Sequence, residues 1–287
     1  MEPHINYITC SNQFQQYRMQ YTAWGVQERS HSTLLCLHAL NRNSRDWDYV
    51  AQHFVKLGYY VIAPDIVGRG NSDYLQLPNG YDIPFYVADM MRLISTLKLT
   101  NINLIGTSLG GLIGMSLSIM PQIVLKKLIL NDVGAEINFA GISRISQYSV
   151  NQPYWENYAE AKEYIINISK PFGDLPDHVW EHITRHSVQK NAIGKYELKR
   201  DPKIMFNVSL TLANPATNTL LWEIWNKNTT PTLIIRGAES DLLSRDTVLK
   251  MCQIQPQARF VEISHTGHAP FLYTDGHFNL INIFLEE

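Results

Sequence analysis

One serine in this chain stands in a setting that suits covalent catalysis. The segment "NLIGTSLGGLIGM" (103–115) places Ser108 among glycines and between two apolar runs. A serine hydroxyl is a weak nucleophile by itself, so it needs a base to accept its proton and a carboxylate to orient that base. We expect His268 to be the base and Asp241 the acid. With this base and this acid, Ser108 would form a covalent acyl intermediate.

Two of these roles have a second candidate. His265 lies close to the end of an apolar run, where we expect it to pack or to bond locally, whereas the context "HTGHAP" favours His268. Asp132 ends the run "LILND" and is the alternative acid. We prefer Asp241 because a later strand end would bring it beside the histidine. Asp132 is then expected to hydrogen-bond nearby backbone.

The residues around Ser108 predict an abrupt strand-to-helix turn. Residues 103–105 read as the end of a buried strand, and 109–120 have helical length before Pro121. The turn between them leaves almost no room for a loop, so its central residue must be strained, and flanking glycines let two backbones pass closely. A G-x-S-x-G spacing alone occurs by chance. The strand–turn–helix context makes it informative.

Apolar strands and helical segments alternate along most of the chain. Expected strands cover 17–24, 33–37, 59–65, 103–105, 125–132, 231–237 and 258–264. Expected helices cover 44–57, 83–97, 109–120 and 246–252, and a last one begins near 275. This alternation predicts a mostly parallel α/β sheet with helices on both faces. Ligands bind beyond the carboxyl ends of such strands, where the candidate serine, acids and histidines all fall.

The middle of the chain does not show this alternation of strands and helices. Residues 134–214 contain no convincing buried strand, and helices are expected near 142–149, 158–169 and 177–189. We therefore predict a core formed by 1–133 and 215–287, with 134–214 as a helical cap (lid) inserted between two strands. The aromatic residues of this region suggest either an apolar acyl pocket or the packing of the lid helices against one another. Its candidate substrate-binding residues are Trp155 and Tyr158, together with Trp222 just beyond the cap.

These features together resemble the α/β-hydrolase fold family over nearly the whole chain. The resemblance rests on "LLCLHALNRNSRDWD" as the strand and oxyanion loop, "APDIVGRGNSD" as the turn after the next strand, and "GTSLGG" as the nucleophile elbow. "LIIRGAESDLLS" and "HTGHAPFL" match the acid and histidine loops. The motifs are specific for the fold and a serine-type triad, but not for a substrate. Some dehalogenase-type relatives carry their acid at the position of Asp132.

The resemblance implies that the backbone amides of Leu109 and Leu40 form the oxyanion hole. Leu109 would begin a helix, where free amide donors and the helix dipole favour a developing negative charge. Ala39 stands where the family usually has glycine, and its methyl group could loosen the donor at Leu40. His38 resembles the family's loop histidine, which supports that loop. Asp65 is expected to organise the turn that follows its own strand.

Composition and charge exclude several other classes of protein. The chain has 287 residues, 45% hydrophobic content and a formal net charge of −2, without a basic stripe for nucleic acid. Three widely spaced cysteines form no disulfide or CxxC pattern, and no secretory signal or membrane-length apolar run is present. We expect a cytoplasmic protein that acts on a small ester-type molecule, without a membrane span or nucleic acid.

One further pattern could bind metal. "HVWEH" (178–182) has the H-x-x-E-H spelling of some zinc peptidases, and His178, His182 and His186 share one helix face. It lies in the insertion, away from the strand ends, and short motif matches are often accidental. We therefore predict no metal and no organic cofactor, and read this face as the polar side of a lid helix.

The predicted function is hydrolysis of a carboxylic ester, thioester or lactone through an acyl-enzyme. Carbon–carbon bond hydrolysis, perhydrolysis and acyl transfer could use the same three side chains. The oxyanion loop "HALNRNS" lacks the glycine-proline-rich character usual in hydrolases of ring-cleavage products. A serine at position 108 also argues against dehalogenases and epoxide hydrolases, which carry aspartate there. A ligand-binding protein without catalysis and a zinc enzyme are the remaining alternatives.

Overall fold

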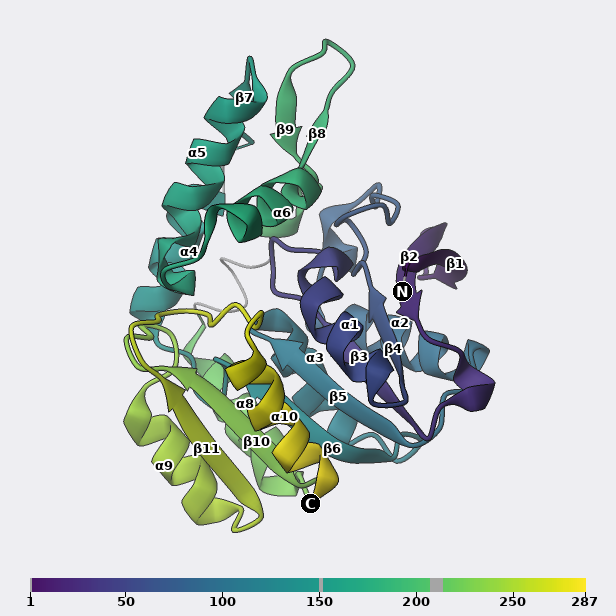
Figure 1. Cartoon of the computed structure of the whole chain (residues 1–287), viewed down its shortest axis with the longest axis vertical. Coiled ribbons are helices and arrows are strands. Elements are labelled where there is room, and N and C mark those ends of the chain that lie inside the picture. Colours follow the sequence, from purple (N-terminus) through teal and green to yellow (C-terminus); the bar gives the residue numbers. More distant parts are fainter. Residues whose placement is uncertain (1, 150–151, 207–213) are drawn as a thin grey trace.

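A single eight-stranded sheet forms the centre of the molecule (Figure 1). The computed structural model describes residues 2–149, 152–206 and 214–287. The spatial strand order is β1-β2-β4-β3-β5-β6-β10-β11. The strands are β1 (His4–Ser11), β2 (Gln16–Trp24), β3 (Ser32–Leu37), β4 (Tyr59–Pro64), β5 (Ile102–Thr107), β6 (Leu125–Asn131), β10 (Thr232–Gly237) and β11 (Ala258–Ile263).

The sheet is parallel from β4 to β11, and β1 and β2 add an antiparallel edge. This agrees with the predicted α/β fold. Within this sheet, β1 is the strand that the sequence analysis did not predict. Its burial alternates only weakly, and most of its side chains are exposed. An edge strand of this kind lacks the buried apolar run that identifies the central strands.

Helices cover both faces of the sheet. On one face lie α1 (Asp48–Lys56) and α10 (Asp275–Glu286), whose apolar residues share one core with Leu34 and Cys36. The opposite core, which includes Leu35 and Leu37, holds side chains from the remaining core helices. These helices are α2 (Ile83–Thr96), α3 (Leu109–Ser118), α8 (Pro215–Lys227) and α9 (Arg245–Ile254). Successive residues of β3 thus face opposite cores, which explains its continuous apolar sequence.

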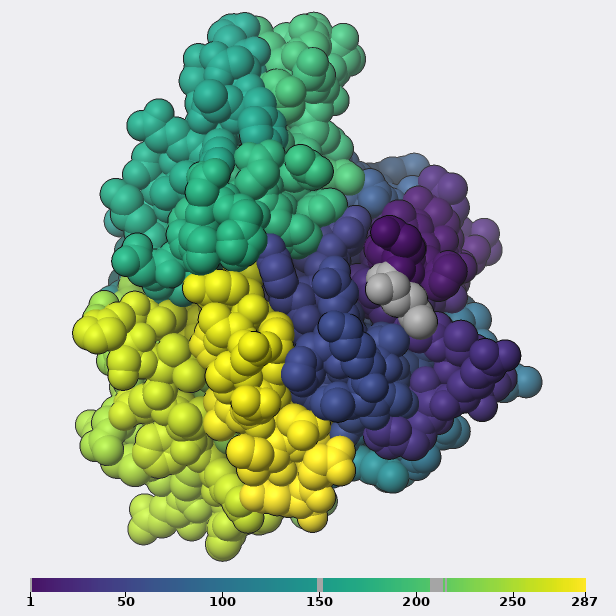
Figure 2. All heavy atoms as spheres, viewed as in Figure 1, coloured from purple at the N-terminus to yellow at the C-terminus, as the bar shows by residue number. Residues whose placement is uncertain are grey.

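The chain between β6 and α8 forms a separate layer above the carboxyl ends of the strands. It contains α4 (Phe139–Ser149), α5 (Tyr158–Ser169) and α6 (Asp177–Ser187) (Figure 1). Helices α5 and α6 share an apolar cluster of their own, whereas Ile142 and Ile145 of α4 join the large core. In the space-filling view this teal and green layer rests on the blue N-terminal and yellow C-terminal parts of the core (Figure 2). We refer to residues 134–214 as the cap, and this division of the chain remains a proposal.

The cap differs in one respect from the expected all-helical insertion. A small antiparallel sheet is formed by β7 (Tyr154–Trp155), β8 (Val188–Lys190) and β9 (Tyr196–Leu198), in the order β7-β9-β8. The helix predicted over 177–189 therefore ends at Ser187, and the next residues turn into a hairpin. Strands of two or three residues carry too little periodicity to be recognised in a sequence.

The turn at Ser108 has the strain that its sequence predicts. Ser108 adopts φ 53° and ψ −115°, a region that side-chain-bearing residues rarely occupy. A Cβ atom on Gly106 would lie 2.3 Å from the backbone of Gly110, and one on Gly110 would lie 2.1 Å from the carbonyl oxygen of Leu37. Helix α3 therefore packs against β3 and β5 at a separation that only glycine permits.

This close approach predicts that Gly110→Ala destabilises the whole fold. The added methyl group meets rigid backbone, so we expect the free energy of unfolding to fall by about 3 kcal/mol or more, measured by urea unfolding. The matched control is Gly276→Ala in α10, where the nearest atom to the new methyl is 3.7 Å away. Equal stability of the two variants would contradict the packing described for α3.

Candidate active site

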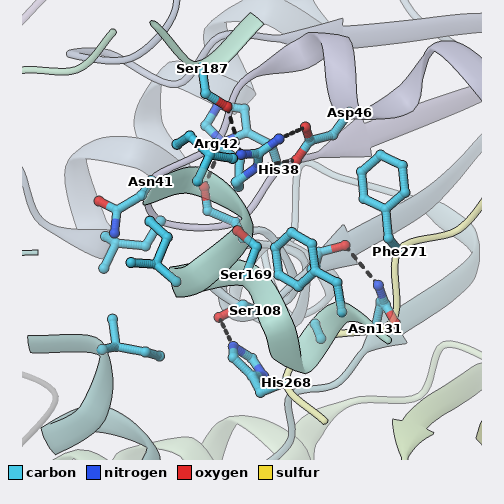
Figure 3. Close-up of a pocket in the computed structure, with 18 of the residues that line it drawn as sticks. His38, Asn41, Arg42, Asp46, Ser108, Asn131, Ser169, Ser187, His268 and Phe271 are labelled. Atoms are coloured by element: carbon cyan, nitrogen blue, oxygen red, sulfur yellow. Dashed lines mark hydrogen bonds and ion pairs between the residues drawn. The ribbon is translucent and has the colours of Figure 1, made fainter. Parts of the chain in front are cut away.

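Three side chains form a continuous hydrogen-bonded chain above the carboxyl end of the sheet. The hydroxyl of Ser108 lies 3.0 Å from Nε2 of His268, and Nδ1 of His268 lies 2.7 Å from Oδ2 of Asp132. Figure 3 shows Ser108 and His268 facing each other at the wall of a cavity. In this arrangement the imidazole can accept the hydroxyl proton while the carboxylate holds its tautomer.

Three separate connections supply these residues. Ser108 lies between β5 and α3, Asp132 directly follows β6, and His268 lies between β11 and α10. Because β5 and β6 are neighbours in the sheet, Ser108 and Asp132 end adjacent strands. The side chain of Asn131 donates to the carbonyl of Pro270, 2.9 Å away, and so ties the histidine loop to the end of β6.

The carboxylate of Asp132 is fully buried but well satisfied. Its Oδ1 accepts from the backbone amide of Gly237 at 2.7 Å, and its Oδ2 accepts from Ser240 Oγ at 2.6 Å in addition to His268. Asp132 has φ 55°, which directs its side chain across the neighbouring end of β10. A buried carboxylate with three donors is held in one orientation, which suits the alignment of an imidazole.

The structure does not join Asp241, the preferred acid, to His268; Asp132, the alternative, makes that contact. Its carboxylate pairs with Arg144 of α4, at 2.6 Å to Nε and 2.8 Å to Nη2, and this hydrogen bonding lowers the pKa of Asp241. Asp241 lies four residues beyond β10, on the rim that meets the cap, whereas the strand end beside His268 belongs to β6. Strand order alone would favour Asp241, because β10 is the neighbour of β11. The loop after β11 instead carries His268 across to the end of β6, a path that the sequence does not give.

The other histidines near this edge have different positions. His265 is exposed and makes no contact with Ser108 in the part of the chain that the structure describes. The buried ring of His38 accepts from the amide of Ile66 through Nε2 at 2.9 Å, so its Nδ1 carries the proton and donates to the carbonyl of Ala39 at 2.8 Å. Burial lowers the pKa of His38 to about 3, which keeps the ring neutral.

The predicted oxyanion loop is held by these contacts. The carbonyl of Ala39 accepts from His38 and from the amide of Arg42 at 3.0 Å. The amide of Leu40 belongs to the same trans peptide group and points away from that carbonyl. The hydrogen bonds that hold the carbonyl therefore also orient the amide. Leu109 is the first residue of α3, and the first amides of a helix have no partner within it. These two amides are therefore plausible donors, and their role in an oxyanion hole stays a prediction.

A cavity of about 90 Å³ opens beside Ser108 and His268. Most of its walls are apolar, with aliphatic and aromatic side chains from both the core and the cap. They include Leu40, Trp47, Ile145, Tyr148, Ile165, Ile168, Phe172, Leu198, Phe271 and Leu272. The polar side of the cavity carries Arg42, whose guanidinium binds Asp46 and Ser187 (Figure 3).

The three aromatic residues predicted to bind substrate lie elsewhere. Trp155 packs against Tyr164 inside the cap, and the hydroxyl of Tyr158 donates to Glu181 on α6. Trp222 donates from Nε1 to Glu136, outside the cavity. Among the cap aromatics, Tyr148 and Phe172 line the cavity instead. Helical periodicity does not distinguish an aromatic residue that faces a cavity from one that packs inside the cap.

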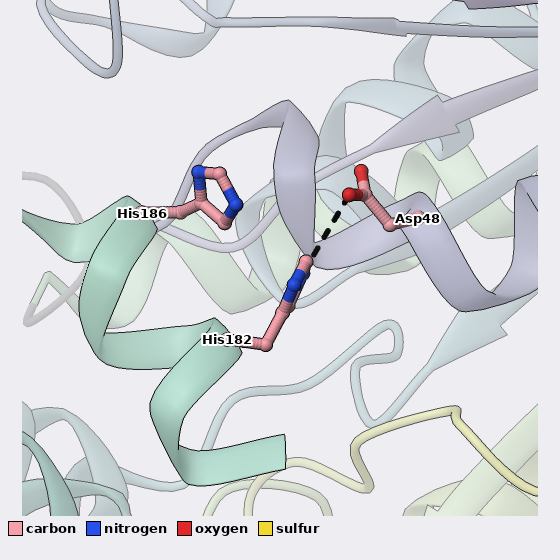
Figure 4. Close-up of side chains that lie close together, drawn as sticks. All are labelled: Asp48, His182 and His186. Carbon is pink, nitrogen blue, oxygen red and sulfur yellow. Dashed lines mark ion pairs between the residues drawn. The ribbon is translucent and has the colours of Figure 1, made fainter. Parts of the chain in front are cut away.

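The histidines of "HVWEH" approach a carboxylate of the core. His182 and His186 of α6 lie near Asp48 of α1, with ligand-type atoms within 4.8 Å of one another (Figure 4). Both oxygens of Asp48 accept from Arg45, however, and Nε2 of His182 lies 2.8 Å from the carbonyl of Arg45. Asp48 is thus engaged within the core, and His182 is engaged between cap and core, so the group fits a metal ion poorly. The expectation of no metal remains a prediction.

The geometry agrees with comparisons to known proteins. Residues 32–275 match the family described as alpha/beta hydrolase fold, so the chain belongs to the α/β-hydrolase family and is a hydrolase. It is 35% identical over 274 residues to a 3-hydroxybutyrate-oligomer hydrolase of Cupriavidus necator, covering 93% of this chain and 92% of that protein.

Two solved structures are also similar over almost their full lengths. A putative hydrolase from Rickettsia typhi superposes with a TM-score of 0.88 at 30% identity, covering 99% of both chains. An alpha/beta hydrolase from Novosphingobium aromaticivorans gives 0.87 at 28% identity, covering 99% of this chain and 98% of that one. Among the described residues, no helix combines the length and apolar character needed to cross a membrane.

The state of His38 predicts a pH dependence of stability. Its folded pKa of about 3 lies below the ordinary value of 6.5, so between these values the unfolded chain binds a proton that the folded chain does not. The stabilising contribution is complete above about pH 6.5 and is lost as the pH falls toward 3. We expect His38→Asn to flatten the fall in unfolding free energy across this range by about 1 kcal/mol per pH unit.

The control is the same substitution at the exposed His265, which should leave the slope as it is in the unsubstituted protein. Urea unfolding at pH 4, 5, 6 and 7 measures all three proteins. A slope for His38→Asn as steep as that of the unsubstituted protein would contradict a buried neutral ring.

Proposed function

We propose that this hydrolase cleaves carboxylic esters through an acyl-enzyme on Ser108. The observation that supports the proposal is the hydrogen-bonded chain from Ser108 through His268 to Asp132. His268 would accept the proton of Ser108 as its oxygen attacks the ester carbonyl, and would then pass that proton to the leaving alcohol. Water, activated by the same imidazole, would release the acid and restore the serine.

The remaining parts of the mechanism follow from the surrounding backbone. The amides of Leu109 and Leu40 would stabilise the oxyanion, and the helix dipole of α3 adds favourable potential at the first of them. Asp132 would keep the proton of His268 on Nδ1 and stabilise the imidazolium as it forms. The strained turn at Ser108 holds the hydroxyl away from the helix and toward the cavity.

The substrate we propose is an ester of a short hydroxy acid. The cavity beside Ser108 is small and mostly apolar, which suits an acyl group of a few carbons better than a long chain. The relative from Cupriavidus necator is named for the hydrolysis of 3-hydroxybutyrate oligomers, which are linear esters of a four-carbon acid. Linear 3-hydroxybutyrate dimers are therefore the first substrates to test.

Removing the proposed nucleophile is expected to abolish the reaction. Ser108→Ala should lower kcat on a short p-nitrophenyl ester and on the 3-hydroxybutyrate dimer by about 10³-fold or more, since the covalent step is lost. A fluorophosphonate probe should label the unsubstituted protein at Ser108. Absence of labelling in folded protein would favour a ligand-binding role, and undiminished turnover by Ser108→Ala would refute the nucleophile.

The assignment of the acid is tested by a matched pair of variants. Asp132→Asn should lower kcat by about 10³- to 10⁴-fold, because an amide cannot hold the required tautomer of His268. Asp241→Asn makes the same chemical change in the ion pair with Arg144, and we expect kcat within about tenfold of the unsubstituted enzyme. The reverse order of effects would show that Asp241 supplies the acid in solution.

A further inference from the structure

A buried serine of the cap lines the cavity beside Ser108 (Figure 3). Ser169 is the last residue of α5, and only 4% of its surface is exposed. The hydroxyl of Ser187, on the same cavity wall, donates to the carbonyl of Ile183 at 2.7 Å, but the hydroxyl of Ser169 bonds to no residue that the structure describes. Buried hydroxyl groups normally have a partner, because an unpaired one gives up its hydrogen bonds to water on folding. An unpaired hydroxyl on a cavity wall therefore points to a polar group of the ligand.

Two contacts fix the segment of the cap that carries this serine. Ser169 leads directly into a short 3-10 helix. In that helix the carbonyl of Pro171 accepts from the amide of Gly267 in the histidine loop at 2.7 Å. The guanidinium carbon of Arg42 in the oxyanion loop lies 5.9 Å from the centre of the Phe172 ring. The segment therefore contacts both loops that serve the proposed reaction, and its serine is held in a defined place relative to them.

Arg42 offers a second polar contact on the cavity wall. Its Nε and Nη2 donate to the carboxylate of Asp46, and its Nη1 donates to Ser187 Oγ at 2.7 Å (Figure 3). These contacts leave one hydrogen on each terminal nitrogen without a partner in the described chain. Because Asp46 compensates the charge of Arg42, this part of the wall suits a neutral polar group better than a second carboxylate.

We propose that Ser169, together with Arg42, binds the free hydroxyl group of a hydroxy-acyl substrate. The inference rests on the proposed ester hydrolysis at Ser108. A hydroxyl can accept from Arg42 while it donates to Ser169, and an alkyl group can do neither. In a linear hydroxy-acid ester, only the unit at the hydroxyl end carries such a group on its acyl side. Binding of this group directs Ser108 to the terminal ester bond, so each turnover releases one hydroxy acid from that end.

The test compares two esters that differ in one hydroxyl group. The probes are ethyl 3-hydroxybutyrate, with each enantiomer measured separately, and ethyl butyrate. Each kcat/KM is divided by the rate constant of the same ester with hydroxide, which removes the difference in intrinsic reactivity. In the unsubstituted enzyme we expect this corrected value for the preferred enantiomer to exceed that for ethyl butyrate by about tenfold or more, because ethyl butyrate leaves the polar groups of the wall unpaired.

Ser169→Ala should lower this ratio by about fivefold or more, by slowing the hydroxy ester while ethyl butyrate keeps its rate. Urea unfolding should show no loss of stability in this variant, because the hydroxyl has no bond to a described residue to lose. Ser169→Thr keeps a hydroxyl and should retain part of the preference. The matched control is Ser116→Ala in α3, a buried helical serine whose hydroxyl donates to the carbonyl of Leu112 at 2.9 Å, and it should keep the full ratio.

Two results would overturn the proposal. One is a corrected ratio near one for both enantiomers in the unsubstituted enzyme, which decides the question even if Ser169→Ala does not fold. The other is an unchanged ratio in folded Ser169→Ala.

Ethyl butyrate also separates this proposal from the proposed function. It carries no hydroxyl group, so its hydrolysis reports on Ser108 without the contact at Ser169. If ethyl butyrate is cleaved but the hydroxy ester is not preferred, the hydroxyl site fails and ester hydrolysis stands. If neither ester is cleaved and Ser108 is not labelled by fluorophosphonate, the proposed function fails and the hydroxyl site fails with it.

Discussion

The close contact between α3 and the strands β3 and β5 is the constraint on which the site depends. Because Gly106 and Gly110 leave no room between the backbones, the chain must reverse within one residue, and that residue is Ser108. The same contact makes Leu109, the residue after Ser108, the first residue of α3. Strain in the turn is offset by burial of the helix against the sheet, so one packing arrangement fixes the position of Ser108.

Asp132 connects the second half of the sheet to this turn. It joins the end of β10, Ser240 and His268 through one carboxylate, so the loop that follows β11 is fixed relative to the end of β5. Asn131 strengthens the same connection through Pro270. The candidate site is therefore built at the junction of β5, β6 and β10, and the cap contributes the walls of the cavity above it.

The sequence predicts most of this core because its signals are local. Glycines around Ser108 and apolar runs of strand length identify elements whose bounds differ by only a few residues from the structure. The identities of the acid and of the pocket residues depend instead on contacts between segments that lie far apart in the sequence. Asp132 and Asp241 both follow a strand, and Tyr148 and Trp155 both lie in an aromatic cap, so only the packing of β6 and α4 separates them.

Backbone hydrogen bonds help to attach the hairpin of β8 and β9 in the cap to the core. The amide of Gly70 donates to the carbonyl of Lys199 at 3.1 Å, and the amide of Asp201 donates to the carbonyl of Gly68 at 2.8 Å. Hydrogen bonds of this type tolerate any side chain that fits the local conformation. These two hydrogen bonds depend on the path of the main chain, so this junction of cap and core can keep its geometry while the side chain at position 199 changes.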